Sequence, residues 1–534
     1  MLQIFSKNYP SVHSRNSIAM PQYSSNRHTL FLLTVLALYL IAYFSHPALP
    51  GNNPAYPLGW WGWFDQGEYL KAAKAIGSHD FSSKNYFYPP LYPLLGAAFA
   101  TVNPMHAFTV LNAACFIIFA HCFVTTAKRY VGWKWAATIF ILTYGFSKHS
   151  VQIWTEPWTS SLVSAIFAFL LGQVDQRTGE NFKVSRTQLA LWGALGGATF
   201  LTRPADAVVI SPLFCYVLWR LWRSRWYQEA PPPVTLIIQK TAALLAPGLL
   251  GVALFAGFNL FVHGSIGGRY FSMAETNGFH AVDLLEKTVS LLFDGGTLYN
   301  APTESILFRA KWLALFVPAA IFGFMRGNAS TRLILALIAT QWLIYSSFAD
   351  LLPTGVWSYH NIHYFKWIFP YAGLLIAVWI KATPLGVAQR AGARYWWISL
   401  TIGTLLLATQ LKLDETAKNE VEATLLQDAH GQFLRIRSST PHTIDKMSVP
   451  QLSGDFQAIY FSTNAKVDAG GKELKFVRDY RFLPSEKGVD LVFIRPVRTD
   501  VINIHAGDMK LAPTSATPHW FTYRFTMGMP AWLR

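Results

Sequence analysis

Two carboxylates stand close together in the polar and aromatic segment 64–69 (FDQGEY). If this segment is helical, Asp65 and Glu68 are three positions apart and lie on one face. A carboxylate near neutral pH can take the proton of an attacking hydroxyl group, which contributes on the order of 10²–10⁴-fold to a rate. The segment is therefore a candidate acid–base site. Two alternatives stay open: Asp65 could cap the helix that it begins, and Glu68 could point into water.

Further ionisable side chains stand next to apolar runs. Glu156 precedes one such run, Arg203 occupies a short turn before Pro204, and segment 359–366 carries His360, His363 and Lys366. Cationic groups of this kind can hold a phosphate and stabilise the charge that develops when it leaves. Acids and cations together therefore suit transfer of a sugar from a lipid-linked phosphate.

Each of these groups also has a structural interpretation. Glu156 could be a favourable charge at a helix N-terminus, and Arg203 could anchor at lipid headgroups. His360 and His363 could ligate a metal, although no acid-rich motif adjoins them. The Trp-rich patch at 60–63 fits a membrane-interface belt as well as a sugar platform.

The composition indicates an integral membrane protein. Of 534 residues, 52% are apolar and only 13% are charged, against about 25% charged in soluble domains. Apolar runs long enough to cross about 30 Å of hydrocarbon recur along the chain. The expected spans begin near Thr29, Ala107, Trp135, Trp158, Gln188, Asp206, Leu236, Ile306, Arg332, Phe365 and Trp396. The sequence thus predicts an α-helical polytopic membrane protein with about 11 transmembrane helices.

The net charge of +16 sorts by side of the membrane. Basic residues gather before the first span and in alternate loops, and the intervening loops have fewer of them. By the positive-inside rule the N-terminus is cytoplasmic, and an odd number of spans leaves the C-terminus outside. The net positive charge therefore reflects the orientation of the chain in the membrane, and a nucleic-acid partner is not expected. The first apolar run could be a signal peptide with Ala48 near its cleavage point, but cleavage would upset the charge alternation downstream.

The chain divides by composition into three parts. Residues 1–28 are expected to be a cytoplasmic tail, 29–411 a transmembrane domain with outside loops at 45–105 and 263–305, and 412–534 an extracytoplasmic domain. An amphipathic stretch in the second loop, 282–293, is either a membrane-surface lid or a connector. The C-terminal part has no spanning run and predicts a small α/β domain, with strands at 457–462, 491–494 and 521–525 and a turn at 468–471.

At these residues the chain resembles the GT-C superfamily of membrane glycosyltransferases, especially the branch of protein O-mannosyltransferases and lipid A aminoarabinose transferases. That branch carries an acidic motif in its first outside loop, followed by Tyr and small residues and then an aromatic-Pro-Pro-Leu turn. The matching positions are Asp65, Tyr69, Ala73, segment 86–91 (YFYPPL), Glu156 in 155–157 (TEP), Arg203 with Pro204 and, more loosely, segment 363–370.

This resemblance implies roles for individual residues. Asp65 would be the base that activates the acceptor, and Glu156 a second active-site acid, with Glu68 as a stand-in for the acid that Gln66 replaces. The residues implied to hold the donor phosphate are Arg203, Lys366, His363 and His360, and those implied to bind substrate are Tyr69, Tyr86 and Tyr88. The chain departs from the aminoarabinose transferases at Tyr88, where they have Lys before the Pro-Pro pair.

The sequence therefore predicts a glycosyltransferase, hexosyl or pentosyl, in a bacterial inner membrane. It would move a sugar from a polyprenyl-phosphate donor to a glycan, lipid or protein acceptor on the extracytoplasmic face. Inverting and retaining outcomes both stay open. No residue is assigned as a metal ligand and no cofactor is certain, while a divalent metal stays open. The alternative is a polytopic transporter or flippase of lipid-linked saccharide, but we find no repeat symmetry of the kind that transporters show.

Overall fold

The protein is described by a computed structural model. The described residues are 25–46, 64–145, 148–178, 182–227, 232–277, 283–348, 352, 354–383, 390–408, 410–460 and 462–528. The Trp-rich patch at 60–63 and most of the expected N-terminal tail lie outside these residues.

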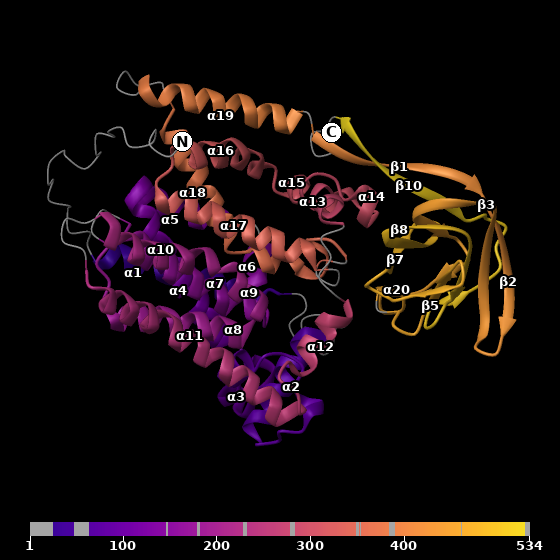
Figure 1. The fold of residues 1–534 in the computed structure, drawn as a ribbon, viewed down its shortest axis with the longest axis horizontal. Helices are drawn as coiled ribbons and strands as arrows, with labels where there is room; N and C mark the ends of the chain where they lie inside the picture. Colours follow the sequence, from indigo (N-terminus) through magenta and orange to yellow (C-terminus); the bar gives the residue numbers. More distant parts are fainter. Residues whose placement is uncertain are drawn as a thin grey trace.

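Helices form one body of the molecule and strands form the other (Figure 1). The longer helices are α1 (Ser25–Phe44), α2 (Phe64–Gly77), α3 (Leu91–Val102), α4 (Thr109–Val131), α5 (Trp133–Gly145), α6 (Lys148–Thr155), α7 (Thr159–Asp175), α8 (Arg186–Thr202), α9 (Pro204–Val209), α10 (Ser211–Tyr227), α11 (Val234–His263), α12 (Gly268–Asn277), α13 (Leu284–Leu292), α16 (Phe316–Arg326), α17 (Ala329–Ser347), α18 (Ile368–Lys381) and α19 (Arg390–Ala408). Short turns of helix, α14 (Gly296–Tyr299), α15 (Ile306–Arg309), η2 (Ser83–Asn85) and η6 (Ser358–Phe365), lie between them.

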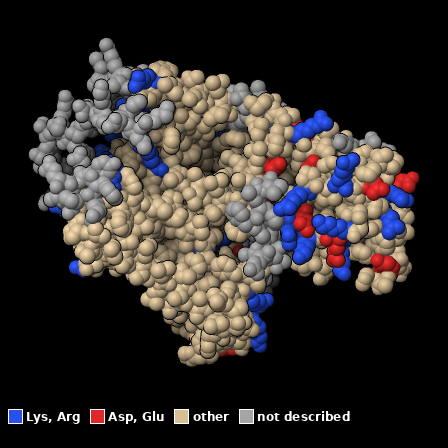
Figure 2. Space-filling view, in the orientation of Figure 1, with Lys and Arg blue, Asp and Glu red and all other residues tan. Residues whose placement is uncertain are grey.

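The helical body is that of a multi-pass membrane protein. Within the described residues, 4 helical segments are long and apolar enough to cross a membrane: Asn26–Phe44, Pro104–Val131, Pro204–Ser224 and Val234–His263. The visible face of this body is largely free of charged side chains, whereas the strand body carries many Lys, Arg, Asp and Glu (Figure 2). The predicted count of about 11 spans is not confirmed.

The expected outside loop at 45–105 contains two helices packed on each other, α2 and α3. Tyr69 and Ala73 of α2 share a buried cluster with Tyr92 and Ala100 of α3. Helix α3 has 12 residues and is therefore about 18 Å long, too short to cross a bilayer. Its exposed apolar side chains include Phe99 and Val102. This helix pair positions the acidic segment 64–69.

Helices α8 and α11 cross at glycine contacts. A Cβ added at Gly193 would lie 2.0 Å from the carbonyl oxygen of Leu244, and one added at Gly251 would lie 2.4 Å from the Cα of Gly197. Small residues four apart, such as Gly193 and Gly197, let helix backbones approach closely in membranes. The crossing fixes the end of α8, where Arg203 follows.

The glycine crossing leads to a stability prediction. Gly251→Leu should lower the free energy of unfolding by about 3 kcal/mol or more, because its side chain would meet the backbone of α8 and not a movable side chain. Gly257→Leu is the matched control. Gly257 lies on the same helix as Gly251, but a Cβ added there would meet nothing within 4 Å. Thermal unfolding of both variants in detergent measures the difference; equal unfolding temperatures would show that the crossing is not tight.

The C-terminal body is an antiparallel sheet domain. Its 8-stranded sheet has the order β1-β10-β3-β8-β5-β6, with β2 on β3 and β7 on β8, and β4 pairs with β9 in a separate 2-stranded sheet. The strands are β1 (Gln410–Glu420), β2 (Glu422–Asp428), β3 (Gly431–Val449), β4 (Leu452–Ser453), β5 (Lys466–Ala469), β6 (Lys472–Leu474), β7 (Tyr480–Ser485), β8 (Gly488–His505), β9 (Lys510–Leu511) and β10 (His519–Gly528).

The sheet domain differs in part from the α/β prediction. The expected strands at 491–494 and 521–525 lie in β8 and β10, and the expected turn at 468–471 joins β5 to β6. The expected strand at 457–462 is wrong, because residues Phe456–Tyr460 form helix α20. Asp455 accepts a hydrogen bond from the backbone N–H of Ala458 (2.9 Å), a helix-starting contact that overrides the apolar pattern. Within the described residues, the domain is more purely β than predicted.

The two bodies meet at α13 and α14. Asn300 donates to Asp490 (2.8 Å) and accepts from Lys446 (3.0 Å), both of the sheet domain. Lys287 of α13 is buried and donates to the carbonyl of Phe348 (2.7 Å). The amphipathic stretch at 282–293 therefore packs as a connector between the bodies, which favours that alternative over a lid.

Candidate active site

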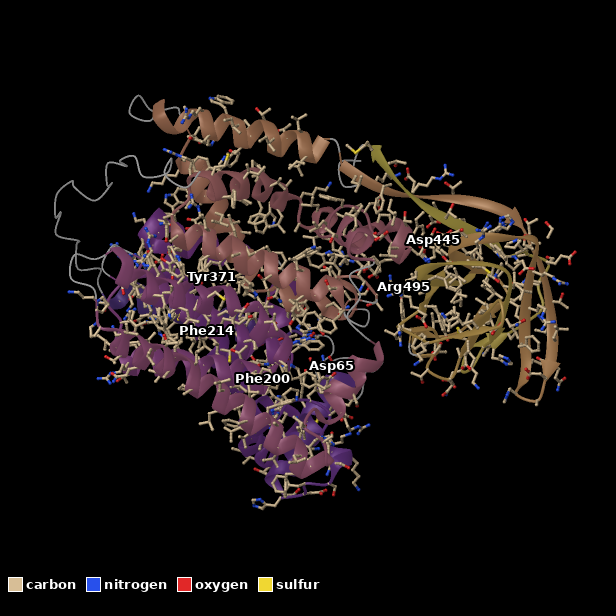
Figure 3. The ribbon with its side chains drawn as sticks, in the orientation of Figure 1. Asp65, Phe200, Phe214, Tyr371, Asp445 and Arg495 are labelled. Atoms are coloured by element: carbon tan, nitrogen blue, oxygen red, sulfur yellow. The ribbon has the colours of Figure 1, made fainter. Side chains whose placement is uncertain are left out.

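Asp65 stands at the start of α2 on the side of the helical body that faces the sheet domain in Figure 3. The phenol of Tyr88 donates a hydrogen bond of 2.6 Å to Asp65 Oδ1. The Tyr88 ring lies 4.8 Å from that of Tyr69, and Tyr69 lies 5.4 Å from Tyr92 of α3. Segment 64–69 and the aromatic-Pro-Pro turn therefore contact each other.

The other polar residues of α2 have different surroundings. Glu68 forms an ion pair of 2.6 Å with Lys71 one turn on. Gln66 is fully buried, and neither its amide nitrogen nor its amide oxygen has a hydrogen-bond partner among the described residues. Glu68 is therefore paired within its own helix, which makes it the weaker candidate.

Glu156 is the centre of a buried polar network. His46 Nε2 and His360 Nδ1 both lie 2.6 Å from its Oε1 atom, and Trp158 Nε1 donates to its Oε2 atom (2.7 Å). Asn112 donates to its backbone carbonyl (2.7 Å). Burial alone would raise the pKa of Glu156, but the two histidines outweigh it and lower the pKa to about 2. Burial in turn would lower the pKa of His360, but Glu156 raises it.

A 3₁₀ helix, η6, positions three of the predicted residues. His360 and His363 lie in η6, and Lys366 directly follows its last residue. His363 stacks on Trp158 with ring centroids 3.8 Å apart, and its Nδ1 lies 2.9 Å from the hydroxyl of Ser160. Burial, followed by the charges of Lys366 and Arg203, holds the pKa of His363 well below its usual value.

Lys366 is buried behind this row. Its Nζ donates to the carbonyl of Ile153 (3.0 Å) and to the hydroxyl of Ser161 (2.6 Å), and it lies 4.4 Å from the centre of the Trp154 ring. The side chain has 0% exposure. These contacts tie the start of α18 to the segment that carries Glu156, and they leave the ammonium no open side toward a ligand.

Arg203 lies between α8 and α9 in an aromatic sandwich. Its guanidinium carbon is 4.2 Å from the ring centre of Tyr364 and 5.3 Å from that of Tyr345. Its Nε lies 3.7 Å from Asp206 Oδ2 and has no hydrogen-bond partner among the described residues. Tyr345 donates to the other oxygen of Asp206 (2.6 Å). Arg203 is 9% exposed, so its charge is held in place and nearly dry.

The charge of Arg203 connects the parts of the site. It acts on Tyr69, whose own surroundings also include Asp65, Tyr364 and the hydroxyl of Thr159. It acts as well on His363. Asp65 and Arg203 therefore both act electrostatically on Tyr69. The Glu156 network reaches His363 through Trp158, which stacks on the His363 ring.

One residue predicted to bind substrate points elsewhere. Tyr86 is 1% exposed and donates to the backbone carbonyl of Asp80 (2.9 Å). Its ring packs on Phe81 and Phe258. The tyrosine therefore holds the loop before α3, and the geometry gives it no place beside Asp65.

Several residues of the site were not singled out from the sequence. His46 comes at the end of α1, Asn112 lies in α4, and Trp158 precedes α7. The signal for His46 is its position as a titratable residue at the end of an apolar span, because such a residue is costly in a membrane and so needs a reason. Asn112 and Trp158 carry no such signal, because single polar and aromatic residues are ordinary in membrane helices.

A basic pocket opens next to the aromatic turn. Its volume is about 420 Å³, and it is lined by Ser83, Lys84, Val262, His263, Ser265, Gly268, Arg269 and Ser272. The guanidinium carbon of Arg269 lies 5.7 Å from the ring centre of Phe87, the neighbour of Tyr88. Two cations and three hydroxyl groups suit an anionic group.

Comparisons with known proteins give distant likenesses. Neither a family model nor a curated protein sequence matches the chain. Among solved structures, ArnT from Cupriavidus metallidurans in the apo state is similar with a TM-score of 0.39 and 14% identity, over 70% of this chain and 62% of that one. The Archaeoglobus fulgidus oligosaccharyltransferase in the apo form is similar with a TM-score of 0.36 and 12% identity, over 72% of this chain and 55% of that one.

The chain thus spans less than two thirds of the length of either protein. At these TM-scores and identities the likenesses transfer neither an activity nor a site residue. A proposal about the function must therefore rest on the side chains of this chain.

Proposed function

We propose that this chain is a membrane glycosyltransferase that moves a sugar from a polyprenyl-phosphate donor to a hydroxyl group of a glycan, lipid or protein acceptor. The observation that supports it is a half-buried carboxylate, Asp65, and a nearly buried guanidinium, Arg203, which both act electrostatically on Tyr69. A proton acceptor and a buried cation match two needs of the reaction: a base for the acceptor and a positive charge for the departing phosphate.

Asp65 is the proposed base. It is half-buried, and the phenol of Tyr88 fixes one of its oxygens at 2.6 Å. This hydrogen bond helps to orient the carboxylate that is proposed to take the acceptor proton. Glu68 is the weaker candidate because its carboxylate is already paired with Lys71 at 2.6 Å.

Arg203 is the proposed contact for the donor phosphate. Its guanidinium is held by Tyr364 and Tyr345 and keeps an Nε without a hydrogen-bond partner among the described residues. A planar guanidinium binds phosphate oxygens in pairs. We assign this contact to Arg203 in preference to Lys366 and His363, because those two side chains have 0% exposure, against 9% for Arg203.

Glu156 is assigned a positioning role and not that of a second base. Both of its oxygens accept hydrogen bonds, from histidine and tryptophan side chains, within 2.7 Å. Its network joins the end of α1, the start of α7 and η6, so it sets the spacing of the site. The proposed topology keeps the N-terminus cytoplasmic and the sheet domain on the extracytoplasmic face of a bacterial inner membrane, supported by the distribution of basic residues.

The first test is to purify the full chain in detergent and to follow the release of polyprenyl phosphate from a polyprenyl-phosphate sugar. The second is mass spectrometry of the surface glycans, lipids and proteins of a deletion strain. We expect donor breakdown only with acceptor present, and the loss of one sugar mass in the deletion strain that the wild-type chain restores. Uptake or flipping of the donor in vesicles, with no donor breakdown and no missing sugar, would overturn the proposal in favour of a transporter.

A further inference from the structure

We propose that His46, Glu156 and His360 form a binding site for a divalent transition-metal ion of the zinc class. The ligand atoms are His46 Nε2, Glu156 Oε1 and His360 Nδ1, which all lie within 4.8 Å of one another. This inference rests on the proposed function for its role at the site, but the binding itself can be measured independently.

The donor set matches the chemistry of such an ion. Two imidazoles and one carboxylate are the protein ligands of many catalytic zinc sites, which keep a further position for water or substrate. Imidazole nitrogen favours zinc and its neighbours over magnesium or calcium, which take oxygen ligands. Both imidazole nitrogens already face one carboxylate oxygen at 2.6 Å.

The spacing requires only small movements. Metal–ligand bonds of 2.0–2.1 Å at tetrahedral angles place ligand atoms about 3.3 Å apart. Both nitrogens of the site lie closer than that to Oε1, and no pair of the three atoms is more than 4.8 Å apart. An ion placed among the three atoms would push the two rings slightly away from Oε1. The rings themselves are already tilted at 66° to each other, with centroids 6.1 Å apart.

The outer contacts are of the kind that orient metal ligands. Trp158 Nε1 donates to Glu156 Oε2, the oxygen that is not shared by the histidines. Asn112 donates to the backbone carbonyl of Glu156, and Tyr92 in turn donates to Asn112 (3.0 Å). Such partners fix a ligating carboxylate and are a regular part of metal sites.

The backbone at His360 supports a ligand role. Its φ is 58°, in the left-handed region that residues other than glycine seldom adopt. Strained residues of this kind gather at ligand-binding sites. His360 is also the accessible member, with 25% exposure of its side chain against 2% for His46 and 0% for Glu156. An oxygen ligand would therefore reach the ion from the side of His360.

In the proposed reaction, that oxygen belongs to the donor phosphate. The ion and Arg203 would then both supply positive charge to the phosphate. Glu156 would then be a metal ligand, and the acceptor proton would go to Asp65. The competing arrangement contains no metal, with Glu156 simply ion-paired to histidine.

The experiment is to strip the full-length protein with EDTA in detergent and titrate it with Zn²⁺ by calorimetry and with Co²⁺ by visible absorption. We expect saturation at a single equivalent and the intense Co²⁺ bands of a four-coordinate site. His46→Gln and His360→Gln should each weaken binding by more than the 10–100-fold that is lost with an outer partner. His430→Gln is the matched control, because His430 is exposed in the sheet domain.

The outcomes separate the metal from the reaction. The variant Asp65→Asn should bind Zn²⁺ as tightly as the wild type even though it has lost transfer activity. This result would show that metal binding does not depend on turnover. Metal uptake by the wild type that matches that of the double variant His46→Gln/His360→Gln would overturn the site while leaving the transferase proposal standing. If the variants fail to elute as folded protein, the wild-type Co²⁺ spectrum decides alone: six-coordinate, weak bands or none would overturn the proposal.

Discussion

Replacing Asp65 by Asn is expected to lower the rate of sugar transfer by about 10²–10⁴-fold, the range that a positioned general base contributes. Asn has nearly the same shape and can still accept the hydrogen bond from Tyr88, so the start of α2 should stay in place. It cannot take a proton from the acceptor. The loss should therefore appear in kcat, with the unfolding temperature unchanged.

Glu68→Gln is the matched control for this substitution. It makes the same chemical change one turn along the same helix, but Glu68 is paired with Lys71 at 2.6 Å. We expect less than about a tenfold effect, since a partly exposed ion pair contributes little. Initial rates with saturating donor and acceptor measure both variants. If Glu68→Gln lost more activity than Asp65→Asn, the base would be Glu68, and the acid missing at Gln66 would have been replaced one turn on.

The sequence was most informative where order along the chain carries the chemistry. Asp65, Tyr69 and the aromatic-Pro-Pro turn follow one another within a short segment, and the structure brings the carboxylate of Asp65 to the phenol of Tyr88. Glu156 and His360 are 204 positions apart. Their contact depends on how α1, α7 and η6 pack, which no local pattern specifies, so His46 could not be recognised as the third member of the group.

The burial of individual side chains also could not be predicted from the sequence. A lysine before an apolar run is equally consistent with an accessible phosphate ligand and with a buried side chain that links two segments by hydrogen bonds. The spacing of Lys366 from His363 is the same in both cases. Only the contacts of its Nζ with Ile153 and Ser161 decide between them. Tyr86 shows the same difficulty, because its position in the aromatic turn is shared with Tyr88 but its side chain points to Asp80.

The fold was predictable in outline and less so in its details. The long apolar runs that became α1, α4 and α11 are recognised by length alone. The weaker elements were decided by neighbours: α3 is too short to span and packs on α2, and α13 joins the sheet domain at β1. Helix α20 depends on one cap, Asp455, in a stretch whose apolar pattern favours a strand.

Arg203→Lys is expected to reduce transfer by about 10²–10³-fold, as the loss of one preorganised charge contact does in other enzymes. The substitution keeps a positive charge but removes the planar group that lies 4.2 Å from the ring centre of Tyr364. A lysine ammonium at this depth would turn toward Asp206 and could not present two parallel N–H donors to a phosphate. The loss should fall mainly on kcat, because the charge on the phosphate grows as the sugar leaves.

Arg435→Lys is the control for this exchange, since Arg435 also stacks on an aromatic ring, 5.5 Å from the centre of Phe433, but does so in the sheet domain. Its transfer rate should equal that of the wild type. Tyr345→Phe separates charge from positioning: it keeps the ring beside Arg203 and removes the hydrogen bond to Asp206. If Tyr345→Phe lowers the rate as much as Arg203→Lys does, Asp206 acts on the substrate directly. A smaller fall supports a role for Arg203 in which Tyr345 and Asp206 only help to position its guanidinium.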